Sequence, residues 1–423
     1  MTLAPLPAPL PAAPLAALTE LTRGVVDLHV RAELAARLAE GRPLRVKAGF
    51  DPTRPDLHLG HTVLMRKMRQ FQDLGHTVVF LVGDYTAMVG DPTGRNKLRP
   101  QLSREDVAAA ARTYVDQACK ILDRERTEVR FNSEWLDTMK PMDLVQLMAK
   151  STVSQMLERN DFKQRFAAEK PIFQHELLYP LLQAYDSVAL DADVEIGGTD
   201  QLFNLMVGRD LMPQYGKRPQ IVMTTPLLEG IDARIDPATG RVQGDKMSKS
   251  ANNYVGIDEP PAEQFRKLML VDDQVVFRYF ELLSAKSAAD IEALRADVAA
   301  GKNPKDAKKL LADEIVTQYH GAEAAVVARK AWDAKFEADA IPDDVAELRL
   351  PCTGEGLWLP KALHLAKLVA SSSQGKQLVE QGGVEVDQIR ITDVKRELAA
   401  GGTYLVRVGS KNRKFARLVV ERT

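Results

Sequence analysis

The chain has 423 residues, 45% of them hydrophobic and 27% charged, which is typical of folded domains and too long for one ordinary core. Its two cysteines exclude a disulfide framework or a cysteine zinc site, and the absence of an apolar run of about 18 residues argues against a membrane span. The net charge of −1 is unevenly spread, because residues 361–423 hold 12 Lys and Arg against 6 Asp and Glu. We expect a soluble, cytoplasmic, multidomain protein whose basic tail meets RNA.

The N-terminal part begins with a proline-rich stretch that lacks the features of a secretory signal, so residues 1–23 are predicted to be a flexible arm leading into a first helix. A strand is predicted at 43–50, a helix with a broad apolar stripe at 58–74, and a second buried strand at 77–82. Strand, helix and strand make a βαβ unit, which predicts a parallel sheet with right-handed crossovers.

The same alternation continues to about residue 250, with helices predicted at 103–122, 141–158 and 174–187 and strands near 129–131, 190–196 and 221–223. Residues 24–258 are therefore predicted to form a doubly wound, Rossmann-like α/β domain with a parallel sheet. In such a sheet, ligands bind beyond the carboxyl ends of the strands.

Three further segments follow the α/β domain. Residues 259–340 are rich in Ala, Leu, Lys and Glu and predict an α-helical domain. Residues 341–358 contain prolines, glycines and an acidic cluster, which predicts a linker. Residues 359–423 predict two helices and then short alternating segments, so we expect a small α+β domain at this end.

The first motif with chemical meaning is His58-Leu59-Gly60-His61, at the start of the helix that follows the first strand. A helix N-terminus at this edge of the sheet favours anions. Gly60 lets a nucleotide approach the backbone, and the two imidazoles offer donors to phosphate oxygens. Two surface histidines at a helix start are the alternative, and on its own the motif also fits small nucleotidyltransferases.

The second motif is Lys246-Met247-Ser248-Lys249-Ser250, which is flanked by glycines and asparagines and is therefore predicted to lie on a loop. Two ammonium groups on such a loop can close over a triphosphate and stabilise the leaving pyrophosphate. A solvated basic loop is the alternative. The presence of both motifs in one chain favours adenylyl transfer from ATP.

Further blocks extend these motifs along nearly the whole chain: Gly49-Phe50-Asp51-Pro52-Thr53, Gly90-Asp91-Pro92-Thr93-Gly94, Gln183-Ala184-Tyr185-Asp186 and Ile196-Gly197-Gly198-Thr199-Asp200-Gln201. In this order they resemble bacterial tyrosyl-tRNA synthetases, which are class I aminoacyl-tRNA synthetases, and the tail resembles an S4 RNA-binding domain. The tryptophan enzymes are the nearest relatives, but they lack this tail and differ around Asp200.

The resemblance implies a tyrosine–tRNA ligase that makes tyrosyl adenylate and pyrophosphate from L-tyrosine and ATP, then transfers tyrosine to the 3′-terminal adenosine of tRNA(Tyr). It implies ATP as a substrate that carries its own Mg²⁺, no tightly bound metal on the protein, and a homodimer without membrane contact. Residues 259–340 would bind the anticodon region. A tryptophan-specific synthetase and a catalytically silent, synthetase-like RNA-binding protein remain as alternatives.

The resemblance also assigns residues to ATP and RNA. Catalytic contacts to the phosphates would come from Thr53, His58, His61, Lys246 and Lys249, and the rest of the ATP site from Gly60, Asp200 and Gln201. Arg95 and Arg99 would belong to a loop that holds pyrophosphate, unless they are ordinary solvated arginines. The expected RNA contacts of the tail are Lys361, Lys376, Lys411, Arg413 and Lys414.

For tyrosine, the resemblance implies a site made of Asp51, Asp91, Tyr179, Gln183, Asp186 and Gln201. Asp186 would accept a hydrogen bond from the phenol and so reject phenylalanine, a form of discrimination for which tyrosyl-tRNA synthetases are themselves a standard example. Tyr179 could instead be a core residue, and the aspartates before proline could simply cap turns.

Lys47 is a departure from the family pattern. It lies four residues before Asp51, where many family members carry a tyrosine whose hydroxyl is the second partner of the substrate phenol. A lysine could donate to the phenol oxygen or point to the surface. The amino-acid assignment therefore depends on Asp186.

Overall fold

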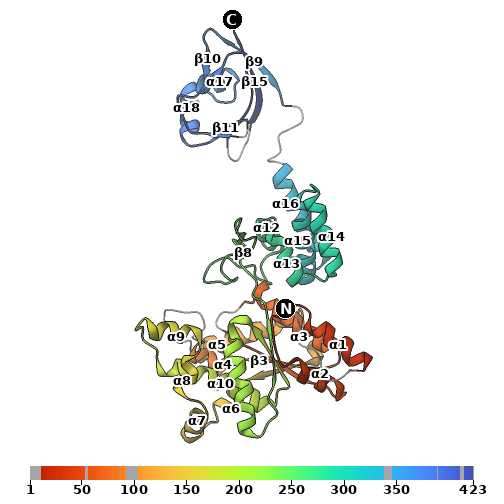
Figure 1. Ribbon diagram of the computed structural model, residues 1–423. Coiled ribbons are helices and arrows are strands. Elements are labelled where there is room, and N and C mark those ends of the chain that lie inside the picture. Colours follow the sequence, from red (N-terminus) through yellow and green to blue (C-terminus); the bar gives the residue numbers. More distant parts are fainter. Residues whose placement is uncertain are drawn as a thin grey trace. The chain divides into compact units, whose positions relative to one another are not determined.

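The computed structural model describes residues 11–52, 56–91, 103–337, 345–387, 389–409 and 414–422 (Figure 1). The chain divides into two compact units, Met1–Arg329 and Lys330–Thr423. Within the described ranges, no helix has the length and apolar character needed to cross a membrane.

The first unit is built on a six-stranded sheet in the order β1-β6-β5-β2-β3-β4. Its strands are β1 Asp27–His29, β2 Arg45–Phe50, β3 Thr77–Val82, β4 Thr127–Phe131, β5 Val194–Gly198 and β6 Ile221–Thr225. All neighbours are parallel except β1, which pairs antiparallel with β6. The predicted doubly wound fold is confirmed, and its strand order reverses between β2 and β5, where ligands bind in such folds.

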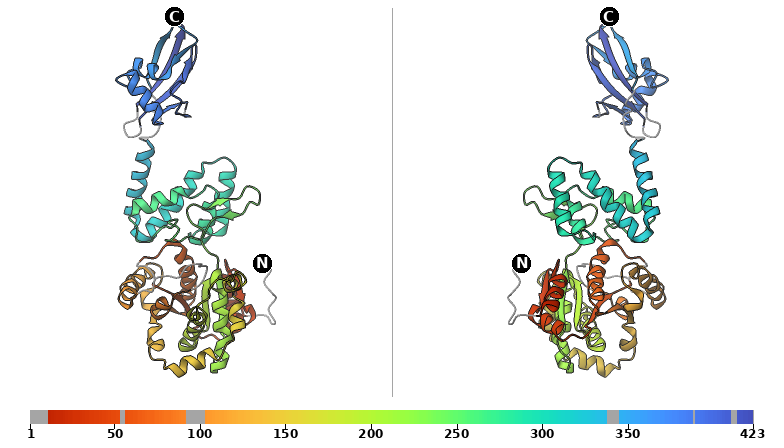
Figure 2. Two further views of the ribbon diagram at one scale, coloured as in Figure 1. Left: turned by 90° about the vertical axis from the view of Figure 1, so that its left-hand side faces the viewer. Right: turned by 90° about the vertical axis from the view of Figure 1, so that its right-hand side faces the viewer.

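Helices cover the sheet (Figure 2), as the buried strands β3, β5 and β6 require. They are α1 Ala12–Thr22, α2 Arg31–Ala39, α3 Leu59–Asp73, α4 Asp84–Val89, α5 Arg104–Ala118, α6 Ser133–Leu136, α7 Pro141–Met148, α8 Val153–Leu157, α9 Asn160–Ala167, α10 Gln174–Leu190 and α11 Leu202–Leu211. The apolar stripe predicted for α3 is buried, including Met65, Met68 and Phe71.

Two predictions about elements in this unit are wrong in detail. The single helix expected at 141–158 is two helices, because Thr152 starts α8 by accepting the backbone N–H of Gln155 at 3.2 Å. The strand expected near 190–196 begins only at Val194, because α10 continues to Leu190 and ends with Asp191 in the left-handed conformation.

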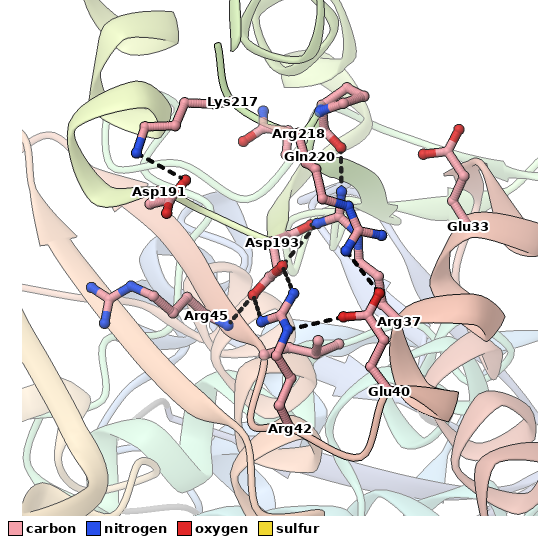
Figure 3. Close-up of polar contacts among 12 residues, drawn as sticks. Glu33, Arg37, Glu40, Arg42, Arg45, Asp191, Asp193, Lys217, Arg218 and Gln220 are labelled. Carbon is pink, nitrogen blue, oxygen red and sulfur yellow. Dashed lines mark hydrogen bonds and ion pairs between the residues drawn. The ribbon is translucent and has the colours of Figure 1, made fainter. Parts of the chain in front are cut away.

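A polar cluster at the amino ends of the strands fixes this part of the sheet (Figure 3). The Asp193 carboxylate, just before β5, accepts from Arg37 of α2 at 3.0 Å, from Arg42 at 2.6 and 2.7 Å, and from the backbone N–H of Arg45 at 3.0 Å. The buried Arg37 also donates to the Pro219 carbonyl at 2.5 Å. These bonds join α2 to the starts of β2, β5 and β6. They lie at the amino ends of the strands, opposite the carboxyl ends where ligands bind in such folds.

The unit continues with a short hairpin, β7 Arg234–Ile235 and β8 Val242–Gln243, and then helices α12 Pro261–Leu270, α13 Val275–Leu283, α14 Ala288–Ala299 and α15 Pro304–His320. Helix α16, Ala322–Glu337, begins in this unit and continues past its last residue, Arg329. The helical character expected after residue 259 is therefore present. Apolar side chains such as Phe265, Phe280 and Leu311 are buried among these helices. The proposed domain boundaries stay predictions.

The second unit holds a five-stranded sheet in the order β12-β11-β14-β15-β9 and a two-stranded sheet of β10 and β13, and helices lie on one side of the larger sheet (Figure 2). Its elements are β9 Glu347–Cys352, β10 Gly356–Trp358, α17 Leu359–Leu365, α18 Ser372–Glu380, β11 Val384–Val386, β12 Ile389–Ile391, β13 Glu397–Ala399, β14 Thr403–Val408 and β15 Lys414–Arg422.

Part of the segment predicted as a linker is structured. Within residues 341–358, β9 pairs in parallel with β15, and β10 pairs with β13. Leu350 and Cys352 are buried in the core of the unit. The prolines and glycines hid this alternation, because β9 is an edge strand that tolerates Pro351.

Candidate active site

A cavity of about 700 Å³ lies at the carboxyl ends of β2 and β5, where the strand order reverses. Its walls come from the end of β2, the start of α3, one face of α10, the turn after β5 and the lysine motif. It gathers twelve of the residues expected for ATP and tyrosine: Asp51, His58, Gly60, His61, Asp91, Tyr179, Gln183, Asp186, Asp200, Gln201, Lys246 and Lys249. Thr53, Arg95 and Arg99 lie outside the described residues.

The two histidines of the first motif are held by their own backbone. His58 caps α3, and its Nδ1 accepts the N–H of Gly60 at 3.2 Å, while its own backbone N–H donates to Nδ1 of His61 at 3.2 Å. Because both Nδ1 atoms accept, each neutral ring carries its proton on Nε2. A Cβ on Gly60 would lie 3.0 Å from the His58 ring, so the glycine is needed for this arrangement.

Both imidazoles are neutral at pH 7. Burial, helped by the neighbouring His61 and Lys249, holds the pKa of His58 well below its usual range. Burial and Lys249 lower the pKa of His61 to about 4. The motif therefore presents two neutral N–H donors at the N-terminus of α3, the arrangement that suits phosphate oxygens.

The lysine motif reaches the cavity from the other side. The buried Met247 anchors it by donating its backbone N–H to the Leu228 carbonyl at 2.8 Å. Lys246 Nζ donates to Asp200 Oδ2 at 2.6 Å, and Lys249 Nζ donates to the Asp56 carbonyl at 2.5 Å. Both ammonium groups thus face acidic or carbonyl oxygens on the cavity wall, although the Lys246 side chain is half exposed.

Tyr179 and Asp51 form one unit in the cavity wall. The Tyr179 hydroxyl donates to Asp51 Oδ2 at 2.8 Å, and Thr86 Oγ1 donates to Asp51 Oδ1 at 2.8 Å. Tyr179 is buried and lines the cavity, so its position is compatible with both the core and the site interpretation. Asp51 accepts two side-chain hydrogen bonds here, and no sequence motif marked Thr86. A Cβ on Gly83 would lie 2.1 Å from Asp51 Oδ1, so only glycine fits beside it.

Asp91 and Gln201 meet at another wall. Gln201 Nε2 donates to Asp91 Oδ2 at 2.9 Å, and Asn204 Nδ2 donates to Gln201 Oε1 at 2.9 Å. The guanidinium of Arg159 lies 3.4 Å from Asp91 Oδ1 and is nearly buried. Arg159 and Asn204 support the predicted residues from segments that the motifs did not mark.

Asp186 lies at the bottom of the cavity, with 2% of its surface exposed. It accepts hydrogen bonds from Trp135 Nε1 at 2.8 Å and from Asn132 Nδ2 at 3.4 Å. Burial raises the pKa of Asp186 to about 7, against the opposing effect of Lys47. Trp135 and Asn132 follow the end of β4, and only that position hinted at a site role.

Lys47 does not point to the surface. Its side chain is 1% exposed, and Nζ lies 3.0 Å from Glu195 Oε1 and donates to the Gln183 carbonyl at 3.4 Å. Of the two alternatives left by the sequence, the surface position is therefore wrong. Glu195, on β5, is equally buried and lines the cavity.

Three of the expected RNA contacts can be placed. Lys361 in α17, Lys376 in α18 and Lys414 at the start of β15 are all exposed on the second unit. Lys411 and Arg413 lie outside the described residues. Among the described residues there is also no group of three or more His, Cys, Asp or Glu side chains that could hold a metal ion.

Comparison with known proteins identifies the family. Residues 39–337 match the family model described as "tRNA synthetases class I (W and Y)", and residues 357–403 match the S4 domain. A tyrosine–tRNA ligase of Thiobacillus denitrificans is 51% identical over 96% of this chain and 99% of its own length. That of Coxiella burnetii is 49% identical over 96% and 98%.

Solved structures agree at the level of the fold. A C-terminally truncated mitochondrial tyrosyl-tRNA synthetase of Aspergillus nidulans matches with a TM-score of 0.62 at 22% identity, covering 77% of this chain and 95% of that one. The tryptophanyl-tRNA synthetase of Plasmodium falciparum matches with a TM-score of 0.56 at 13% identity, covering 80% and 91%. The choice between tyrosine and tryptophan therefore comes from the full-length relatives. The chain belongs to the tyrosine–tRNA ligase family of class I tRNA synthetases.

Proposed function

We propose that this chain charges tRNA(Tyr) through the cavity between β2 and β5, with the two motifs acting on the ATP phosphates and Asp186 selecting tyrosine. Its family joins tyrosine to tRNA and uses ATP, with Mg²⁺, as a substrate. The observation that carries the proposal is the single cavity that holds His58 and His61, the two motif lysines, and the buried Asp186.

In the first step, a carboxylate oxygen of tyrosine attacks the α-phosphate of ATP in line. The new bond joins that oxygen to phosphorus, and the bond to the β-phosphate oxygen breaks, so pyrophosphate leaves with the electron pair. The nucleophile is already an anion, so no general base is needed, and catalysis consists of positioning and charge stabilisation. His58 and His61 donate from Nε2, and Lys246 and Lys249 neutralise the charge that develops on the leaving group.

ATP binding is proposed to replace the hydrogen bond between Lys246 and Asp200. Asp200, proposed for the ribose hydroxyls, is hydrogen-bonded to Lys246 at 2.6 Å. In our proposal, ATP takes both groups: the ribose binds the carboxylate and the phosphates bind the ammonium. Thr53, Arg95 and Arg99 are proposed to join them on the phosphates, and Mg²⁺ arrives on ATP rather than in a protein site.

Tyrosine is proposed to lie with its phenol at Asp186 and its ammonium near Asp91, Tyr179 and Gln183. These groups supply carboxylate, phenolic and amide oxygens as acceptors. Gln201, which is hydrogen-bonded to Asp91, orients the carboxylate of the substrate tyrosine toward the α-phosphate. Asp51 is part of the same site because it accepts a hydrogen bond from the Tyr179 hydroxyl. A phenylalanine would leave Asp186 without its partner in a buried site, which opposes its binding.

In the second step, the terminal adenosine hydroxyl of tRNA attacks the carbonyl carbon of tyrosyl adenylate. The ester bond forms, the bond from that carbon to the phosphate oxygen breaks, and AMP leaves with the electron pair while the hydroxyl proton is released. Residues 259–340 together with the basic tail hold the RNA. We also propose a cytoplasmic homodimer. The homodimer is supported by an exposed apolar surface on α7 and α8, where four side chains are each more than half exposed: Met142, Val145, Met148 and Val153.

The test is exchange of labelled pyrophosphate into ATP with single amino acids. We expect exchange with tyrosine and only a trace with phenylalanine or tryptophan. Exchange with tryptophan in place of tyrosine would support the tryptophan alternative, and no exchange with any amino acid would support the catalytically silent one. Either result would overturn the proposal.

A further inference from the structure

A buried ion pair lies beneath the proposed tyrosine site and has no part in the steps described above. Lys47 of β2 and Glu195 of β5 are direct partners in the parallel sheet, at the place where the strand order reverses. Their side chains are 3.0 Å apart, and each is 1% exposed. Burying two charges costs desolvation free energy, so a buried ion pair is weak evidence of stabilisation and can instead serve a specific role in the site.

The pair is bonded to the helix that carries the tyrosine site. Glu195 Oε1 accepts from Gln183 Nε2 at 3.3 Å, and Glu195 Oε2 accepts from Ser187 Oγ at 3.1 Å and from Gln220 Nε2. Lys47 Nζ donates to the Gln183 carbonyl at 3.4 Å. The pair thus holds α10 at residues 183 and 187, on either side of Asp186, and orients the amide of Gln183.

The pair also sets the charge around Asp186. Lys47 of β2 and Glu195 of β5 act electrostatically on Asp186 of α10. Burial raises the pKa of Tyr179 on the same helix, and Asp186 adds to this effect. Trp135 and Asn132 are neutral donors to the Asp186 carboxylate. The ammonium of Lys47 favours the ionised form of Asp186 and acts against burial, and Glu195 acts weakly in the opposite direction. Without Lys47, the buried Glu195 carboxylate would lose its cation, and the ammonium that offsets the burial of Asp186 would be gone, which disfavours the ionised form of both.

We infer that Lys47, through its pair with Glu195, is a specificity-determining and positioning residue: it holds α10 and the Gln183 amide in place so that the Asp186 carboxylate can receive the tyrosine phenol. This inference rests on the proposed function. Many family members carry a tyrosine at the position of Lys47, and its hydroxyl contacts the substrate phenol directly. In this chain the buried ammonium of Lys47 would instead act on the phenol indirectly, through the Asp186 carboxylate.

The experiment compares three variants in pyrophosphate exchange and in calorimetric binding of tyrosine at pH 6 and pH 8. Lys47→Met removes the ammonium and keeps the length of the side chain. The double variant Lys47→Met, Glu195→Gln removes both charges, so no single charge is left buried. Lys308→Met is the matched control, because Lys308 is also a buried lysine paired with an aspartate, Asp273, but lies on α15.

For Lys47→Met we expect the KM for tyrosine to rise about 10- to 100-fold, the KM for ATP to change less than about twofold, and the preference for tyrosine over phenylalanine to fall. The pH at which tyrosine binding is half-maximal should move upward. The double variant should unfold thermally like the parent chain and still show part of each change, because the effect of Lys47 on Asp186 exceeds that of Glu195. Lys308→Met should bind tyrosine normally.

A double variant that is folded and has the parent KM, selectivity and pH dependence for tyrosine would overturn the inference, since the pair would then be purely structural. Equal rises in the KM for tyrosine and in the KM for ATP would also overturn it, because they would indicate general damage to the cavity. Failure of the proposed function is a separate result: the parent chain itself would then give no tyrosine-dependent exchange.

Discussion

The two ends of the cavity are built in different ways. The proposed phosphate end is made from two short motifs, in which His58, Gly60 and His61 hold one another and Met247 anchors the lysines. The proposed tyrosine end is assembled from separate parts of the fold, because Asp186 on α10 is bonded to Trp135 of α6 and to Asn132 after β4, and the pair between β2 and β5 is bonded to α10. A local motif can carry the chemistry shared by a superfamily, whereas substrate choice is distributed over the fold.

The largest effect should come from the phosphate end. Lys246→Met removes an ammonium that is proposed to stabilise the leaving pyrophosphate, so kcat for exchange should fall about 100- to 1000-fold with little change in the KM for tyrosine. Lys302→Met, which removes an exposed lysine paired with Asp297, is the control and should be neutral. A rise in the KM for tyrosine without loss of kcat would contradict the assignment of Lys246 to the phosphate end.

At the tyrosine end, Asp186→Asn keeps the shape of the side chain and an acceptor for Trp135, but it removes the charge. We expect the KM for tyrosine to rise about 10- to 100-fold, because hydrogen bonds to charged groups are the strong ones. The KM for phenylalanine should change little. Steady-state exchange with both amino acids measures this, and Asp210→Asn on the exposed side of α11 serves as the control.

The pH dependence should separate the two ends as well. Since the pKa of Asp186 is about 7, the carboxylate is mostly protonated at pH 6 and mostly ionised at pH 8. The kcat/KM for tyrosine should therefore rise about tenfold between these pH values. In Asp186→Asn this rise should disappear. The same steep rise in the variant would assign it to another group.

The same raised pKa has a consequence for stability. The folded chain holds the Asp186 proton more firmly than the unfolded chain does, so this group contributes stability at low pH that is lost as the pH rises through about 7. Chemical denaturation should therefore show a smaller drop in stability between pH 5 and pH 8 for Asp186→Asn than for the parent chain. An identical drop in both chains would contradict the assigned pKa.

The smallest effect is expected in the basic tail. Lys376→Ala should raise the KM for tRNA only a few-fold and lower the slope of log affinity against log salt by about 1, because it removes one proposed phosphate contact. Tyrosine-dependent exchange should not change, since that reaction uses no tRNA. Lys170→Ala, an exposed lysine of the first unit, is the comparison in a filter-binding titration across salt concentrations.

The same contrast explains what could be predicted from the sequence. The βαβ order and the two motifs follow from local periodicity and spacing, and the structure contains them. The partner of Lys47 could not be predicted, because it depends on which residue of β5 lies beside β2. Trp135 reaches Asp186 only through the packing of α6 against α10, and β9 was missed because its pairing with β15 spans almost the whole second unit.

The most direct test of the two-ended cavity is a crystal structure of this chain with a non-hydrolysable tyrosyl adenylate analogue. We predict the phenol oxygen within hydrogen-bond distance of Asp186, the Lys47–Glu195 pair intact beneath it, and the phosphate mimic between His58, His61 and the lysine motif. A phenol bound away from Asp186, or a phosphate mimic out of reach of both motifs, would contradict the account.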